Sequence, residues 1–156
     1  MRRFCTDALP ALIALAGALG AVAPAAALDY DAAMKESQAA IGRTVADYAL
    51  TDSDGRRVRF TEFRGKPLLV SFVYTGCSQV CPTTTTFLDQ AVRQSAVALG
   101  ANAFNVVTVG FNLPFDNPAA MRQFAKQRGI DRANWRFLSP DAGVAQEMTN
   151  AFGFAH

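Results

Sequence analysis

An apolar run that ends in two closely spaced cysteines constrains the fold of this chain more than any other feature. Residues 67–74 are rich in β-branched and aromatic side chains, which is typical of a buried strand. The run breaks at Gly76, and Cys77 and Cys81 follow in a short loop. Pro82 has a fixed φ that suits the first position of a helix, where its missing N–H is not needed. We therefore predict a strand, a loop carrying two thiols, and a helix that starts at Pro82.

The two thiols are predicted to carry the chemistry of this chain. Cys81 is expected at the helix cap, where backbone N–H groups and the helix dipole favour a thiolate. Cys77 precedes it closely enough to bring its sulfur alongside. Two soft sulfurs at the carboxyl end of a central strand suit a reversible disulfide or a thiophilic metal. A purely structural disulfide is a weaker explanation, because so short a closed loop gains little chain entropy.

Length and charge restrict the classes of partner. A chain of 156 residues fits one domain with a substantial core. The formal net charge is only +2, and the lysines and arginines form no cluster. Nucleic acid is therefore not an expected partner.

The N-terminal segment is typical of an export signal. Two arginines follow the first residue, residues 8–28 carry no charge, and residues 25–27 are small. We predict that residues 1–27 are a signal peptide, with an uncleaved membrane anchor as the alternative because the run is just long enough to span a bilayer. Cleavage would also remove Cys5 and leave one close pair of cysteines, which is consistent with an oxidising compartment.

The rest of the chain alternates between strand and helix patterns after a weakly helical linker at residues 28–41. The alternation predicts an α/β fold with a parallel sheet and right-handed crossovers. Ligands bind beyond the carboxyl ends of such strands, so we expect residues 112–117 to lie beside the cysteines. The predicted elements are a hairpin over 47–60 with its turn at 52–55, helices over 82–99, 119–128 and 141–152, and strands over 104–111 and 135–139.

Several apolar residues are predicted to form the core. Phe87, Val92 and Leu99 recur at helical spacing and are expected to face the sheet. The aromatic residues of the later segments are also predicted to be buried; these are Phe111, Phe124, Trp135 and Phe137.

Residues 74–82 resemble the cysteine motif of the Sco/SenC copper chaperones, which serve cytochrome c oxidase assembly. Further matches are residues 65–67 before the strand, Asp116 after the next strand, and residues 134–138. The resemblance implies a thioredoxin-like fold over residues 42–156, in an exported and often membrane-tethered domain. It also implies a copper site made of the two motif cysteines and a histidine much nearer the C-terminus, with Asp116 close by. An aspartate in such a loop is also a common turn former.

His156 does not match the family position of the third ligand. It is the only histidine and the last residue of the sequence, whereas the family ligand lies on a hairpin after a Gly-Phe segment that residues 152–154 resemble. We therefore expect the third copper ligand to lie beyond His156 and expect His156 itself to have no role. Without that hairpin, the strand before the cysteines is expected to leave one edge unpaired, and the fold to be incomplete at the C-terminus.

These observations lead to a functional hypothesis. The chain is predicted to be a periplasmic copper chaperone, soluble or anchored to the inner membrane, with Cys77 and Cys81 as copper ligands and as a redox-active disulfide. Its partner is predicted to be the copper-receiving subunit of cytochrome c oxidase; the sequence identifies neither the copper donor nor the thiol reductant. A zinc site is less expected in this sequence than a copper site, because no set of four ligands is present. The alternatives are a thiol-disulfide oxidoreductase, whose usual C-x-x-C spacing is one residue tighter, and a redox sensor.

Overall fold

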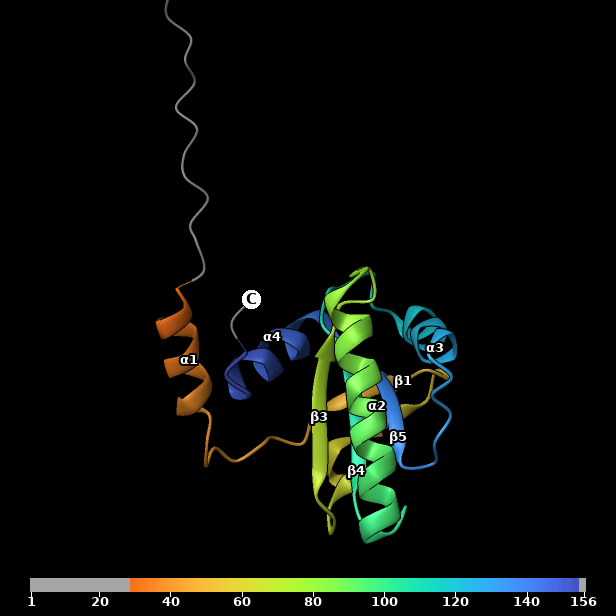
Figure 1. Cartoon of the computed structure of the whole chain (residues 1–156). Helices are drawn as coiled ribbons and strands as arrows, with labels where there is room; N and C mark the ends of the chain where they lie inside the picture. The colour runs from red at the N-terminus through yellow and green to blue at the C-terminus, as the bar shows by residue number, and fades with distance from the viewer. Residues whose placement is uncertain (1–28, 155–156) are drawn as a thin grey trace, which may run out of the picture.

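The computed structural model describes residues 29–154, which form a five-stranded sheet with helices on both faces (Figure 1). The predicted signal segment 1–27 and His156 lie outside the described residues, so what the sequence predicts for them stays a prediction. Among residues 29–154, no helix is long and apolar enough to cross a membrane. The elements are α1 (Tyr30–Ala39), β1 (Ala49–Asp52), β2 (Arg57–Arg59), the 3-10 helix η1 (Phe60–Phe63), β3 (Leu68–Val73), α2 (Val80–Leu99), β4 (Asn105–Gly110), α3 (Pro118–Gln127), β5 (Trp135–Ser139) and α4 (Ala142–Ala151).

The predicted hairpin is confirmed, and it extends the sheet beyond the parallel strands. β1 pairs antiparallel with β2, with Leu50 opposite Val58, and both side chains are buried. Gly55 completes the turn with a φ of 85°, a left-handed conformation that glycine adopts without strain. β1 also pairs antiparallel with β5, with Thr51 opposite Ser139.

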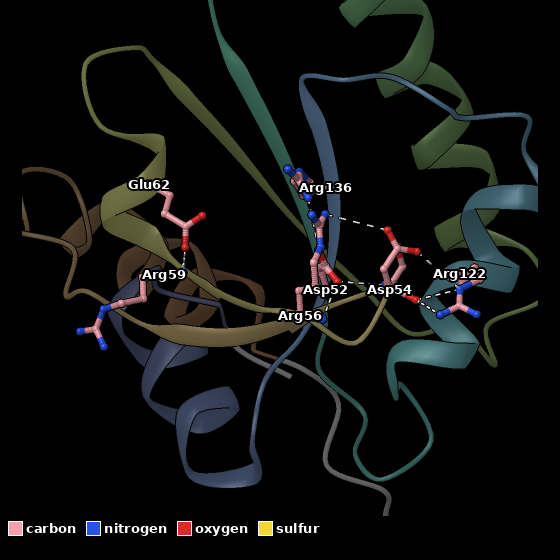
Figure 2. Close-up of polar contacts among 8 residues, drawn as sticks. Asp52, Asp54, Arg56, Arg59, Glu62, Arg122 and Arg136 are labelled. Atoms are coloured by element: carbon pink, nitrogen blue, oxygen red, sulfur yellow. Dashed lines mark hydrogen bonds and ion pairs between the residues drawn. The ribbon is translucent and has the colours of Figure 1, made fainter.

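A buried carboxylate holds the hairpin turn together. The side chain of Asp52 accepts hydrogen bonds from the backbone N–H groups of Asp54 and Arg56, each at 2.9 Å. Its other oxygen meets the guanidinium groups of Arg56 at 3.0 Å and of Arg136, from β5, at 3.2 Å (Figure 2). Arg122 of α3 donates to the carbonyl of Ser53 in the same turn. The turn is therefore fixed to both β5 and α3.

The strand before the cysteines lies at the edge of the sheet. The strand order is β2-β1-β5-β4-β3, and β3 runs parallel to β4 as the alternating pattern predicts. Within residues 29–154, β3 pairs with β4 alone, which agrees with the expected unpaired edge and not with a central position. The prediction of a fully buried strand is wrong there, since the side chain of Leu69 is 43% exposed. The apolar side chains of β3 still contribute to the core, because Val70 and Phe72 pack against the apolar cluster on the α4 side of the sheet.

Helices cover the two faces of the sheet separately. Val92 of α2 and Phe124 of α3 belong to one apolar cluster, together with Trp135 and Phe137 of β5. Met148 of α4 belongs to the cluster on the opposite face. The predicted burial of Phe124, Trp135 and Phe137 is confirmed. α1, which falls in the predicted linker, lies away from the sheet (Figure 1) and has no buried residue.

The buried face of α2 differs from the predicted one. Phe87 and Leu99, expected to face the sheet, are 64% and 69% exposed. The helix buries Val92 together with the polar residues Thr85 and Asp89. Burial of these two groups is tolerated because the Thr85 hydroxyl donates to a backbone carbonyl and the Asp89 carboxylate accepts from arginines. The sequence prediction counted apolar side chains alone and therefore missed this orientation.

Candidate metal centre

A short loop between β3 and α2 brings the two cysteines together. The backbone N–H of Cys77 donates to the carbonyl of Tyr74 at 3.0 Å, which closes a turn directly after β3. The backbone N–H of Cys81 then donates to the Sγ atom of Cys77 at 3.5 Å. Both residues are free thiols, and both are partly exposed. The two thiols therefore lie together beyond the carboxyl end of β3.

The helix after the loop begins earlier than predicted. Its first residue is Val80, so Cys81 lies inside the first turn and Pro82 follows as the third helical residue. The prediction that Pro82 opens the helix, with Cys81 as its cap, is wrong. No N–H group of the first helical turn has a partner within the helix, so the missing N–H of proline costs no hydrogen bond at the third position.

The helix N-terminus acts on Cys77 rather than on Cys81. The pKa of the Cys77 thiol is lowered to about 7, mainly by the backbone N–H of Cys81 and next by that of Gln79. Burial is the largest of the effects that raise the pKa of Cys81, and the neighbouring Cys77 and Asp116 raise it further. Near neutral pH, Cys77 is therefore the cysteine that ionises, in part, while Cys81 stays a thiol, which reverses the sequence prediction.

Asp116 fastens the loop after β4 to the cysteine loop. Its side chain is fully buried. One carboxylate oxygen accepts from the backbone N–H of Thr75 at 2.9 Å and from its hydroxyl at 2.5 Å. The other oxygen accepts from the backbone N–H of Asn112 at 2.8 Å. The two loops are therefore neighbours, as predicted. Asp116 links them, in addition to shaping its own turn.

The last residue of β4 must be small for Asp116 to reach this position. A Cβ atom at Gly110 would lie 2.5 Å from the Cβ of Asp116 and 2.8 Å from the sulfur of Met121. Both distances are far below van der Waals contact. Glycine at position 110 therefore permits the close approach of the two loops.

Two sulfurs are the metal-binding groups that this region offers. Among residues 29–154, no group of three or more His, Cys, Asp and Glu side chains is placed to hold a metal ion. The thiols of Cys77 and Cys81 are soft donors, which select Cu(I) over hard cations. The low pKa of Cys77 favours both metal binding and attack on a disulfide, because the thiolate performs both reactions.

Two residues of this region were missed from the sequence. Thr75 supplies two of the hydrogen bonds to Asp116, and its place just before Cys77 could have suggested such a role. Arg128, at the end of α3, interacts electrostatically with Cys81. No spacing in the sequence connects Arg128 with Cys81, because an interaction between distant residues depends on tertiary packing.

Comparison with known proteins identifies the family. A family model described as SCO1/SenC matches residues 36–156. The chain belongs to the SCO1/SenC family. Its described residues share the architecture of Sco structures, which have a thioredoxin-like fold, and the fold predicted from the sequence is confirmed. The match begins inside the segment predicted to be a linker.

Individual members of the family are distant in sequence. The SCO1 protein homolog of Bacillus subtilis is 25% identical over 110 residues, which are 69% of this chain and 53% of the relative. The chain thus spans about half the length of that relative. The structure of Bradyrhizobium japonicum ScoI with copper bound has a TM-score of 0.60 and 25% identity, and the match covers 70% of this chain and 67% of ScoI.

A further solved structure is BsSco, described as a member of the Sco family of cytochrome c oxidase assembly proteins in which a disulfide switch was identified. It has a TM-score of 0.62 and 19% identity, with 70% of this chain and 63% of BsSco covered. At this identity the likeness shows the fold alone.

Proposed function

We propose that this chain is an exported copper chaperone that binds Cu(I) through Cys77 and Cys81 and delivers it to the copper-receiving subunit of cytochrome c oxidase. The observation that carries this proposal is the hydrogen bond from the backbone N–H of Cys81 to the sulfur of Cys77, which holds two free thiols in one loop of a chain of the SCO1/SenC family and helps lower the pKa of Cys77 to about 7. Copper is bound by the relative ScoI, and BsSco is an oxidase assembly protein. The pattern of residues 1–27 supports export.

The two cysteines have different parts in copper binding. Cys77 is partly ionised at neutral pH, so its thiolate can bond the incoming ion first. Cys81 retains its proton until the ion arrives, because metal binding displaces the proton of a ligand thiol. Asp116 holds Thr75, and with it the start of the loop that presents Cys77. A third ligand, expected from the family resemblance to be a histidine, would come from outside residues 29–154.

The same geometry favours one alternative, a thiol-disulfide exchange function as an oxidoreductase or a redox sensor. The thiolate of Cys77 would attack a substrate disulfide, and Cys81 would then resolve the mixed disulfide. The unequal pKa values of the two thiols suit this division of roles. A disulfide switch was identified in BsSco, which supports weighing this alternative. The two functions differ in their need for a metal.

The ligand assignment is tested by titrating the reduced protein with Cu(I) without oxygen, in competition with a chromogenic chelator. The wild-type chain is expected to bind one equivalent, and Cys77→Ser or Cys81→Ser to lower the affinity at least about a hundredfold, because a single thiolate cannot chelate. Ser78→Ala, in the same loop, is the matched control and should bind like the wild type.

Two results would contradict the proposal. Stoichiometric copper in the double serine variant would show that the ligands are wrong. Rapid turnover of unrelated disulfide substrates by the metal-free protein, with weak copper binding, would instead favour the thiol-disulfide exchange function.

A further inference from the structure

A cavity opens at the amino end of β3, on the face of the sheet that α4 covers. Its volume is about 260 Å³. Aromatic and aliphatic side chains form its wall, namely Phe60, Phe63, Leu68, Val70 and Phe152. These side chains belong to the apolar cluster on the α4 side of the sheet or pack against it. The cysteines follow the opposite end of β3, so the cavity is separate from the candidate metal centre.

Two positive charges at the rim of this cavity have no acidic partner within residues 29–154. Arg64 and Lys66 line the cavity, and neither forms an ion pair there. Asp47 also lines the cavity, but its carboxylate is neutralised by Arg59 at 2.7 Å and accepts from the backbone N–H of Thr61 at 2.9 Å. The rim therefore has an excess of positive charge above an apolar wall.

The segment that carries the two cations is held in place by its own backbone. The N–H of Arg64 donates to the carbonyl of Thr61 at 3.2 Å, which closes the end of η1. Arg64 and Gly65 form a turn, and Lys66 follows directly. The cavity and the positive charges at its rim are therefore present before any ligand arrives, as is usual for small-molecule sites.

An apolar wall below a positive rim is complementary to a molecule with an apolar body and one anionic group. The apolar body gains by leaving water, up to about fourfold in affinity for each buried CH₂ group. The anion gains from each of the two solvent-exposed cations, at most about fivefold. A fatty acid, the carboxylate that hydrolysis of a membrane lipid releases, has this chemistry.

We propose that this cavity binds a free fatty acid, with the acyl chain against the aromatic wall and the carboxylate between Arg64 and Lys66. The cavity volume lies just below the range usual for drug-sized ligands, so it suits one acyl chain of moderate length and not a two-chain phospholipid. This binding site is a second site of the chain, and it does not depend on the proposed copper function.

The test is calorimetric titration of the full chain at pH 7 with decanoate and with decanol, both below the concentration at which they form micelles. Decanol has the same apolar chain and no charge, so we expect decanoate to bind more tightly. Affinity should also rise from hexanoate through octanoate to decanoate, by up to about fourfold for each added CH₂ group.

Two double variants locate the carboxylate. Arg64→Gln with Lys66→Gln removes both charges from the rim and should weaken decanoate binding about tenfold, while decanol affinity stays within about twofold. Lys35→Gln with Lys126→Gln is the matched control, because it removes the same charge from exposed positions of α1 and α3 that do not line the cavity. The control should bind both ligands like the wild type.

Three results would overturn the proposal. The first is the absence of decanoate binding by the wild-type chain. The second is an equal loss of decanoate affinity in both double variants, which would show a general effect of charge. The third is binding to phosphatidylglycerol vesicles that needs Arg64 and Lys66 without any binding of decanoate, which would identify a membrane contact instead. The Cu(I) affinity of the cysteines is measured separately and should be the same in all these variants.

Discussion

Two buried aspartates, one in the hairpin turn and one beside the cysteines, are stabilised in opposite ways. Asp52 and Asp116 are 2% and 0% exposed, and each accepts several hydrogen bonds that tie one segment to another. Asp52 forms ion pairs with Arg56 and Arg136. Asp116 accepts from uncharged donors alone among residues 29–154, namely groups of Thr75 and Asn112.

The difference separates a structural carboxylate from one that acts on the site. The arginines at Asp52 neutralise its charge within the hairpin, so little of its field extends further. The charge of Asp116 is not neutralised by a cation in this way, and it contributes to the raised pKa of Cys81, for which burial is the largest cause. Removal of either aspartate should weaken the fold, but only removal of Asp116 should change the chemistry of the cysteines.

The largest effect on stability is expected from Asp52→Ala. Two backbone N–H groups would lose their acceptor and two arginines would lose the buried carboxylate they pair with, which together should cost about 3 kcal/mol in the free energy of unfolding. Denaturation in urea measures this loss, and the alkylation rates of the two cysteines should not change. Asp54→Ala, at an exposed position in the same turn, is the control and should cost less than about 0.5 kcal/mol. A loss below about 1 kcal/mol in Asp52→Ala would mean that the network of Asp52 is not structural.

A smaller loss of stability, with a change at the site, is expected from Asp116→Asn. The Asn side chain has one accepting oxygen where Asp116 has two, so one set of hydrogen bonds is broken. The free energy of unfolding should fall by about 1 to 2 kcal/mol. The pKa of Cys81 should fall, because a negative charge that raises it has been removed. The pH dependence of alkylation in a Cys77→Ser background measures that pKa.

Thr75→Val is the matched control for Asp116→Asn. It removes the hydroxyl that donates to Asp116 and keeps the carboxylate charge. It should therefore destabilise the loop without lowering the pKa of Cys81. A similar fall of the Cys81 pKa in both variants would show that loosening of the loop, and not charge, is the cause.

The smallest effect is expected on the stability that Asp52 provides when the pH changes between 6 and 8. Burial of Asp52 favours its protonated form, but hydrogen bonds led by the backbone N–H groups of Arg56 and Asp54 outweigh it, so its pKa is lowered below 3.8. The stability that comes from Asp52 is therefore fully present above about pH 4 and is lost only as the pH falls through this lowered value. Between pH 6 and 8 the carboxylate does not titrate, so the difference in melting temperature between the wild type and Asp52→Ala should change by less than about 2 °C.

The cysteine loop should respond in that same pH range. In Cys81→Ser, which keeps the backbone N–H that donates to Cys77, alkylation by iodoacetamide should accelerate about tenfold from pH 6 to pH 8 as Cys77 ionises. The lowered pKa of Cys77 also favours the folded state. This contribution to the free energy of unfolding is fully present above about pH 9 and is lost as the pH falls through about 7. An alkylation midpoint near pH 9 would show that the helix N-terminus does not act on Cys77.

The local features of the chain were predictable because neighbouring residues decide them. The hairpin turn follows from an aspartate that bonds its own backbone and a glycine that accepts a positive φ. The strand, loop and helix around the cysteines follow from an apolar run, a glycine and a proline. The contact between the cysteine loop and the loop after β4 was also predicted, because consecutive parallel strands usually lie side by side.

By itself the sequence determined the elements, the parallel pairing of β3 with β4, and the two thiols at the carboxyl end of β3. Only the tertiary structure decided which thiol ionises, because that depends on the direction of one N–H group in a helix that starts at Val80. It also decided which face of α2 is buried, where Thr85 and Asp89 find hydrogen-bond partners. The physical reason is range: turns and caps depend on neighbours in sequence, whereas the field at a sulfur depends on groups that only packing brings close.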